Sequence, residues 1–158
     1  MVVTVNSGYF SHPVQDDRQK IVFTNGCFDI IHRGHVDYLN RAKSLGDYLI
    51  VGLNSDNSIK RIKGPKRPIN DQDSRKFVLE NLRAVDQVII FDEDTPLKLI
   101  KMVKPKVLVK GGDWSVKDIV GSDFVKDRGG EVYSLKFVDN FSTTNIINEI
   151  LNKSSIVN

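Results

Sequence analysis

Short apolar runs alternate with segments of helical spacing along most of the chain, and this alternation limits the folds that it can adopt. The apolar runs are typical of buried strands and lie at 21–23, 48–53, 87–91, 107–109 and 132–135. The segments with helical spacing lie at 34–45, 74–83, 96–103 and 143–151. Strands that alternate with helices in this way form a parallel sheet with helices on both faces. We therefore predict an α/β fold, a Rossmann-like, doubly wound, parallel five-stranded sheet in a single domain.

The length of 158 residues suffices for one domain with a core of its own. We expect this domain over residues 21–152, with a short C-terminal tail over 153–158. Residues 1–20 are polar and irregular, so we predict an N-terminal arm there. Its valines at positions 2, 3 and 5 could pack on a neighbour or add an edge strand.

Charge, cysteine content and hydropathy exclude several classes of protein. The net charge of +3 is too small to indicate nucleic-acid binding. The one cysteine, Cys27, excludes an internal disulfide and fits a reducing compartment. No apolar run approaches the length of a membrane span, and the first twenty residues lack the pattern of a signal peptide. We expect a cytoplasmic protein whose partners are small molecules, with neither nucleic acid nor membrane among them.

The stretch TNGCFDIIHRGH, residues 24–35, joins the first expected strand to the first expected helix. His32 and His35 are three residues apart, which places them on one face of a helical turn. The free N–H groups at the start of a helix favour anions. Two imidazole donors beside such a helix start indicate a phosphate site. A metal-binding pair is an alternative, although helical metal ligands are more often four residues apart. Structural histidines are the other alternative.

The pattern Gly26-x-Phe28-Asp29-x-x-His32-x-Gly34-His35 resembles the H-x-G-H signature of the cytidylyltransferase-like nucleotidyltransferases. The segments RPIN, FDEDTP, VLVKGGDW, GGEV and STTNII follow in order. With them the chain is similar to the branch that forms ADP-heptose, the D-glycero-D-manno-heptose 1-phosphate adenylyltransferases. The resemblance extends from about residue 21 to residue 151 and implies a homodimer. Some relatives carry a sugar kinase ahead of this domain; we recognise none here and expect a single catalytic step.

The resemblance implies that three residues are catalytic. His32 and His35 would donate hydrogen bonds to the α-phosphate and to the leaving group. A lysine from the basic loop after the second strand would reach the triphosphate or the sugar phosphate. Lys63 is our choice, because it lies nearest to the Gly-Pro pair in that loop, and Lys60 and Lys66 remain alternatives.

Nucleotide contacts are expected from three segments. Paired glycines in KGGD let the backbone approach a ligand closely, and the three hydroxyls of STT exceed what capping of the last helix requires. The residues that we expect to bind the nucleotide are Thr24, Asn25, Gly26, Cys27, Phe28, Gly34, Lys110, Gly111, Gly112, Asp113, Ser142, Thr143 and Thr144. Asp113 could instead cap the next helix, and Ser142 or Thr143 could cap the last one.

Two further residues are assigned to the second substrate. Arg75 is expected in the first turn of a helix, the unfavourable end for a cation. That misfit, with an arginine at this place in the family, suggests a substrate contact; the alternative is a surface arginine paired with Asp71. Asp29 is assigned to the substrate as well, with orientation of the turn or of a histidine as its alternative.

The activity implied by the resemblance is transfer of AMP from ATP to heptose 1-phosphate, giving ADP-heptose and pyrophosphate for lipopolysaccharide or another surface glycan. Mg²⁺ is expected with ATP, held mostly by phosphates, and no metal-binding residues are assigned. The alternatives are a cytidylyltransferase acting on a polyol phosphate such as glycerol 3-phosphate, a coenzyme-forming adenylyltransferase, and a non-catalytic nucleotide-binding domain. Cytidylyltransferase relatives carry an arginine shortly before STT; residues 137–141 hold none, which argues against that branch.

Overall fold

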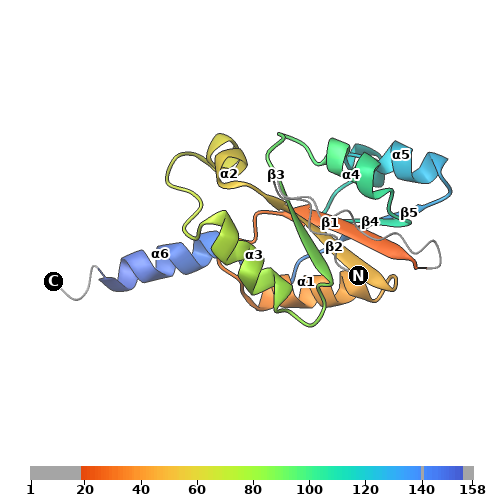
Figure 1. Ribbon diagram of the computed structural model, residues 1–158. Helices are drawn as coiled ribbons and strands as arrows, with labels where there is room; N and C mark the ends of the chain where they lie inside the picture. Colours follow the sequence, from red (N-terminus) through yellow and green to blue (C-terminus); the bar gives the residue numbers. More distant parts are fainter. Residues whose placement is uncertain (1–18, 140, 155–158) are drawn as a thin grey trace, which may run out of the picture.

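The computed structural model describes residues 19–139 and 141–154. Its sheet contains the parallel strands β1 (Ile21–Gly26), β2 (Tyr48–Asn54), β3 (Gln87–Phe91), β4 (Val107–Gly111) and β5 (Glu131–Leu135). Their order is β3-β2-β1-β4-β5 (Figure 1). Strands β2 and β3 therefore lie on one side of β1, and β4 and β5 lie on the other. The predicted doubly wound α/β fold is confirmed, and each predicted strand overlaps an observed one.

The helices are α1 (Arg33–Lys43), α2 (Asp56–Lys63), α3 (Gln72–Glu80), α4 (Leu97–Val103), α5 (Ser122–Asp127) and α6 (Thr143–Ser154), with a 3-10 turn, η1 (Val116–Asp118). Four of them were predicted, but α2 was wrongly taken for a loop and α5 was not foreseen. Ser55 Oγ accepts the N–H of Ser58 at 3.0 Å and begins α2. Gly64, at a φ of 92°, ends it. The Gly-Pro pair of the predicted loop therefore follows a short helix and ends it.

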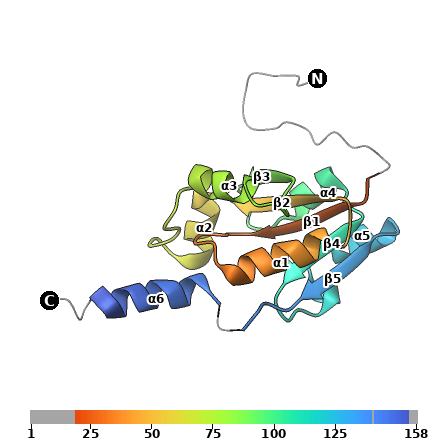
Figure 2. The same ribbon diagram turned by 90° about the horizontal axis from the view of Figure 1, so that it is seen from below.

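Successive residues of β1 supply the two halves of the core. Val22 packs in a cluster with residues of α1 and α3, such as Leu39 and Leu79. Phe23 points to the other face, where it packs in a cluster with residues of α4 and α5, such as Ile100. Figure 2 shows the helices on the two sides of the strands. The β1 strand is thus buried on both faces, as expected for the centre of a parallel sheet.

Helix α6 leads away from the sheet in both views (Figures 1 and 2). Thr143, its first residue, is the one buried residue among the described part of this helix. Within residues 19–139 and 141–154, no helix has the length and apolar character needed to cross a bilayer. The arm expected over 1–20 and the tail over 153–158 fall mostly outside the described residues, and Lys153 and Ser154 continue α6.

The ends of β1 and β2 are joined by a buried arginine of α3. The Nη1 of Arg75 donates to the carbonyl oxygens of Cys27 at 2.7 Å and Asn54 at 2.9 Å. Its Nε donates to the Asn70 carbonyl at 3.0 Å, and its Nη2 to Asp56 Oδ1 at 2.8 Å. These four acceptors compensate a cation in the first turn of a helix, where the helix dipole disfavours it. The arginine fixes the edge of the sheet from which the site is built.

Replacement of Arg75 by alanine should lower the free energy of unfolding by about 3–5 kcal/mol, because it leaves Asp56 and three carbonyl oxygens without their buried donor. Urea denaturation followed by circular dichroism measures this loss. The matched control is Lys76→Ala in the same helix, which should change the free energy of unfolding by less than about 0.5 kcal/mol. Equal, small losses in both variants would contradict the role given to Arg75.

Candidate active site

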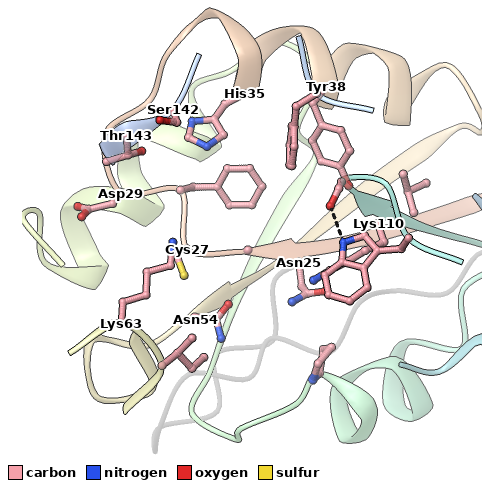
Figure 3. Close-up of a pocket in the computed structure, with 18 of the residues that line it drawn as sticks. Asn25, Cys27, Asp29, His35, Tyr38, Asn54, Lys63, Lys110, Ser142 and Thr143 are labelled. Atoms are coloured by element: carbon pink, nitrogen blue, oxygen red, sulfur yellow. Dashed lines mark hydrogen bonds between the residues drawn. The ribbon is translucent and has the colours of Figure 1, made fainter. Parts of the chain in front are cut away.

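A cavity of about 520 Å³ lies at the carboxyl ends of β1 and β4 (Figure 3). These two neighbouring strands are the ones at which the strand order reverses. In doubly wound sheets ligands bind beyond the carboxyl ends of the strands at that reversal. The cavity is lined by the turn after β1, by α2 and the loop after it, by the end of β4, and by the segment that leads into α6.

The two histidines begin α1 and stack on one another. The ring centroids of His32 and His35 are 3.8 Å apart, and the rings are inclined by 19°. His32 is the N-cap residue, and its Nδ1 accepts the backbone N–H of His35 at 3.4 Å. Because Nδ1 is an acceptor, the neutral ring of His32 carries its proton on Nε2. Both histidines line the cavity, so the pair offers imidazole donors to a ligand there.

Burial keeps both imidazoles neutral near pH 7. It lowers the pKa of His35 to about 4, helped by the charges of His32 and Lys63, while the Ile30 carbonyl acts in the opposite sense. Burial also lowers the pKa of His32. The pair therefore contributes neutral hydrogen-bond donors, and positive charge in the cavity comes from lysine and arginine.

Of the three candidate lysines, Lys63 alone is among the residues that line the cavity. It lies in the last turn of α2, and its charge contributes to the lowered pKa of His35, so the two side chains are electrostatically coupled. Lys60 and Lys66 lie outside the lining. Lys110, on β4, also lines the cavity, and burial lowers its pKa. The choice of Lys63 agrees with this placement, and its catalytic role stays a prediction.

Nine of the thirteen residues assigned to the nucleotide line the cavity: Asn25, Gly26, Cys27, Phe28, Lys110, Gly111, Ser142, Thr143 and Thr144. Thr24 does not, because its buried hydroxyl shares a 2.6 Å hydrogen bond with the hydroxyl of Tyr38. Gly34 packs against the His32 ring, which lies 3.1 Å from where a Cβ would be. Gly112 and Asp113 lie beyond the lining.

The structure shows which of Asp113, Ser142 and Thr143 caps a helix. Asp113 is 87% exposed and faces Lys136 at 4.0 Å. The next helical turn, η1, begins after Ser115 without a side-chain cap, so Asp113 is no cap. Ser142 Oγ accepts the N–H of Asn145 at 3.0 Å and caps α6. Thr143 Oγ1 donates to the Ile30 carbonyl at 3.2 Å, which ties the start of α6 to the histidine turn.

Arg75 does not reach the cavity, and the carboxylate of Asp29 is already engaged by protein groups. Arg75 is buried away from the lining, and its ion-pair partner is Asp56, so the alternative pairing with Asp71 was wrong. Asp29 lines the cavity, but its carboxylate accepts the N–H groups of Ile69 and Asn70 and the Nε of Arg67. The observed contacts of Asp29 are thus those of its alternative, orientation of the turn.

Several lining residues were not assigned from the sequence: Asn54, Arg67, Thr95, Trp114, Phe137 and Phe141. The indole of Trp114 donates to the Gly111 carbonyl at 3.1 Å, and its backbone N–H donates to Ser134 Oγ at 3.0 Å. Phe137 packs over Gly111 so closely that a Cβ there would lie 2.3 Å from the ring. The position of Trp114 directly after KGGD was a usable signal. Phe137 and Phe141 gave none, because isolated phenylalanines are most often core residues.

Aromatic rings lie at both ends of the cavity: Phe28 and Phe141 pack beside the histidines, whereas the end at β4, here called the aromatic end, holds Trp114 and Phe137. Figure 3 shows His35, Ser142 and Thr143 toward one side with Asp29 and Lys63, whereas Asn25 and Lys110 lie toward the other. At the aromatic end, the ring of Phe137 lies 5.3 Å from that of Tyr38. Such a cavity suits an elongated ligand with anionic groups at one end and a flat ring at the other. Among the described residues, no three His, Cys, Asp or Glu side chains cluster closely enough to hold a metal ion.

Comparison with known proteins gives a consistent result. The sequence profile of the cytidylyltransferase-like family matches residues 23–149. "Bifunctional protein HldE" of Geobacter metallireducens is 58% identical over 133 residues, which cover 84% of this chain and 27% of that protein. The protein of the same name from Campylobacter concisus is 60% identical over 136 residues, covering 86% and 28%. The chain thus spans somewhat more than a quarter of the length of these curated relatives.

A solved structure also matches the fold. The lipopolysaccharide core biosynthesis protein of Thermoplasma volcanium superimposes with a TM-score of 0.60 and is 32% identical in sequence. The match covers 76% of this chain and 97% of that protein. A fold similar to that of most of this chain thus makes up nearly the whole of that solved chain.

The lowered pKa of His35 predicts a loss of stability in mild acid. Between about pH 6.5 and pH 4, His35 binds a proton in the unfolded chain but not in the folded one, so the free energy of unfolding falls as the pH drops. Above pH 6.5 the residue is neutral in both states and has no such effect. Urea denaturation at pH 7 and pH 5 should show a smaller acid-induced loss in His35→Gln than in the unaltered protein. Equal losses in the two proteins would contradict the neutral state of His35.

Proposed function

The chain belongs to the cytidylyltransferase-like family, and from this membership we propose that it transfers AMP from ATP to D-glycero-D-manno-heptose 1-phosphate, giving ADP-heptose and pyrophosphate. The observation that carries the proposal is the stacked pair His32 and His35, neutral and facing a cavity that Lys63 also lines. The choice of heptose is supported by the motifs from RPIN to STTNII. Similarity to a lipopolysaccharide core biosynthesis protein supports the pathway.

The proposed reaction needs alignment more than proton transfer. An oxygen of the sugar phosphate attacks the α-phosphorus of ATP, a new P–O bond forms, and the bond to the leaving pyrophosphate breaks. The attacking phosphate is already ionised at neutral pH, so a strong general base is unnecessary. Catalysis then consists of orientation and of donors placed where negative charge develops. The neutral imidazoles of His32 and His35 fit the role of such donors, with Lys63 as the nearby cation.

The two ends of the cavity suggest the orientation of ATP. We place the adenine at the aromatic end, beside Trp114 and Phe137, and the outer phosphates at the start of α6. Of the three hydroxyls there, those of Ser142 and Thr143 already bond to the chain, so Thr144 is the one that is free of such bonds among the described residues. The helix start itself favours anions.

Mg²⁺ belongs to the proposal as the ion that offsets the charge of the triphosphate. The described residues provide no cluster of carboxylates for it, so phosphate oxygens would supply most of its ligands. A cytoplasmic location and a homodimer complete the proposal, and both rest on the sequence: on its single cysteine and on the family resemblance. With a net charge of only +3, we propose no nucleic-acid partner.

Pyrophosphate release by the purified protein tests the substrates directly. ATP and CTP are each combined with D-glycero-D-manno-heptose 1-phosphate and with glycerol 3-phosphate, and we expect turnover with ATP and the heptose phosphate. Turnover with CTP and glycerol 3-phosphate alone would favour the cytidylyltransferase alternative. Binding of ATP without turnover in any combination would favour a non-catalytic domain.

The histidines should act on the transition state more than on nucleotide binding. Each donor should contribute roughly 3–4 kcal/mol there, so His32→Ala and His35→Ala should each lower kcat by a hundredfold or more. The affinity for ATP, measured by calorimetry, should change little. The double variant should lose less than the product of the single losses, since both donors serve one phosphate. A single variant with near-normal kcat and a lower melting temperature would show that its histidine is structural.

A further inference from the structure

The cavity contains an arginine, the first residue of the RPIN segment, to which the sequence analysis assigns no role. Arg67 lies in the loop between α2 and α3, and its side chain is 14% exposed. Its Nε donates to Asp29 Oδ2 at 2.9 Å, and the Asp29 side chain is 1% exposed. Arg67 lines the same cavity as Lys63 and the two histidines. The buried Asp29 carboxylate therefore holds the guanidinium at the wall of the cavity.

The other half of this guanidinium remains available. Neither Nη nitrogen of Arg67 donates to a residue within 19–139 or 141–154, and neither is among the buried polar atoms that lack a partner there. Both Nη groups thus have no hydrogen-bond partner among the described residues, on a side chain that lines the cavity. Two parallel N–H donors on a planar cation match two oxygens of one phosphate.

The ion pair is better explained as support for Arg67 than as compensation for Asp29. The Asp29 carboxylate already accepts the backbone N–H groups of Ile69 and Asn70, at 2.9 and 2.9 Å. An arginine needed only to neutralise a carboxylate commonly pairs with it through two nitrogens. Here one nitrogen, Nε, makes the contact. Asp29 consequently fixes the orientation of the side chain through Nε and leaves the two Nη nitrogens of the guanidinium for another ligand.

The negative charge that the proposed substrates bring favours a further protein cation in the cavity, in addition to Mg²⁺. The two proposed substrates bring several phosphate groups, and the histidines are neutral near pH 7. The segment before α6 lacks an arginine at 137–141, and Arg75 is buried outside the lining. Besides Lys63 and Lys110, Arg67 is the cation that lines the cavity among the described residues. Of the three carboxylates that line it, Asp29 is paired with Arg67 and Asp94 with Arg61, each at 2.9 Å, and Asp118 ends η1, which follows β4.

We propose that Arg67 binds a phosphate group of a substrate through its two Nη nitrogens, and that Asp29 is the positioning residue that holds it there. The inference rests on the proposed function, because it presumes substrates that carry phosphates. The phosphate belongs either to the outer part of the triphosphate or to the sugar phosphate, and the ligand chemistry is the same in both cases.

Binding measurements separate these two sources. The chain has one tryptophan, Trp114, and it lines the cavity, so its fluorescence reports binding beside calorimetry. ATP, AMP and heptose 1-phosphate are titrated into the unaltered protein and into Arg67→Ala. A loss of about ten- to a hundredfold in affinity for ATP but not AMP assigns Arg67 to the outer phosphates. The same loss for heptose 1-phosphate, with ATP unchanged, assigns it to the sugar phosphate.

Three further variants test the geometry. Arg67→Lys keeps the charge but loses the fork, so it should recover only part of the lost affinity. Asp29→Asn should weaken the same ligand as Arg67→Ala while the affinity for the other ligand is kept, which a general loss of folding would not produce. Arg83→Ala removes an exposed arginine outside the cavity and should bind all three ligands normally.

Unchanged affinity of Arg67→Ala for all three ligands would overturn the proposal. If that variant fails to fold, Arg67→Lys gives the decision, and full affinity for all three ligands in that variant would overturn the bidentate contact. The titrations need no turnover. A protein that binds ATP or the sugar phosphate through Arg67 but releases no pyrophosphate would refute the proposed reaction and leave this inference standing.

Discussion

The site depends on two buried charges that tie separate segments of the chain to the ends of β1 and β2. Arg75 reaches from α3 to the carbonyl oxygens of Cys27 and Asn54. Asp29 holds the loop before α3 through the N–H groups of Ile69 and Asn70. Buried ions of this kind are costly unless every group is paired. The turn that carries the histidines, the loop that carries Arg67, and the start of α3 are thereby locked into one relative geometry.

This geometry lets a site work with neutral imidazoles. Burial lowers the pKa values of both histidines, which makes them poor cations but leaves them effective hydrogen-bond donors. Electrostatic attraction for phosphate is then assigned to Lys63, Lys110 and Arg67, which come from different elements of the fold. Different side chains thus attract the phosphates and donate hydrogen bonds to the transition state.

The sheet was predictable because its signal is local and repeated: apolar runs of strand length alternate with helical spacing. The position of His32, His35 and Ser142 followed from the same logic, since a strand end or a helix start fixes each of them. Helix α2 was missed because its eight residues present few apolar positions and a glycine follows directly. Arg75 and Arg67 could not be told apart by sequence. One is buried under carbonyl oxygens and the other faces the cavity, and this difference arises from tertiary contacts that no local pattern records.

Helix α6 combines a site-forming first turn with a body that buries almost nothing. In the described chain, Thr143 is its one buried residue, and a single hydroxyl bond to Ile30 joins it to the histidine turn. Segments with so few buried contacts open at a small fraction of the global free energy of unfolding. The wall proposed for the outer phosphates is thus made from a helix with one buried residue, and the histidines from α1, which buries Gly34, Tyr38, Leu39 and Ala42. A ligand that bridges the two orders the helix as it binds, so occupancy of the cavity and rigidity of α6 rise and fall together.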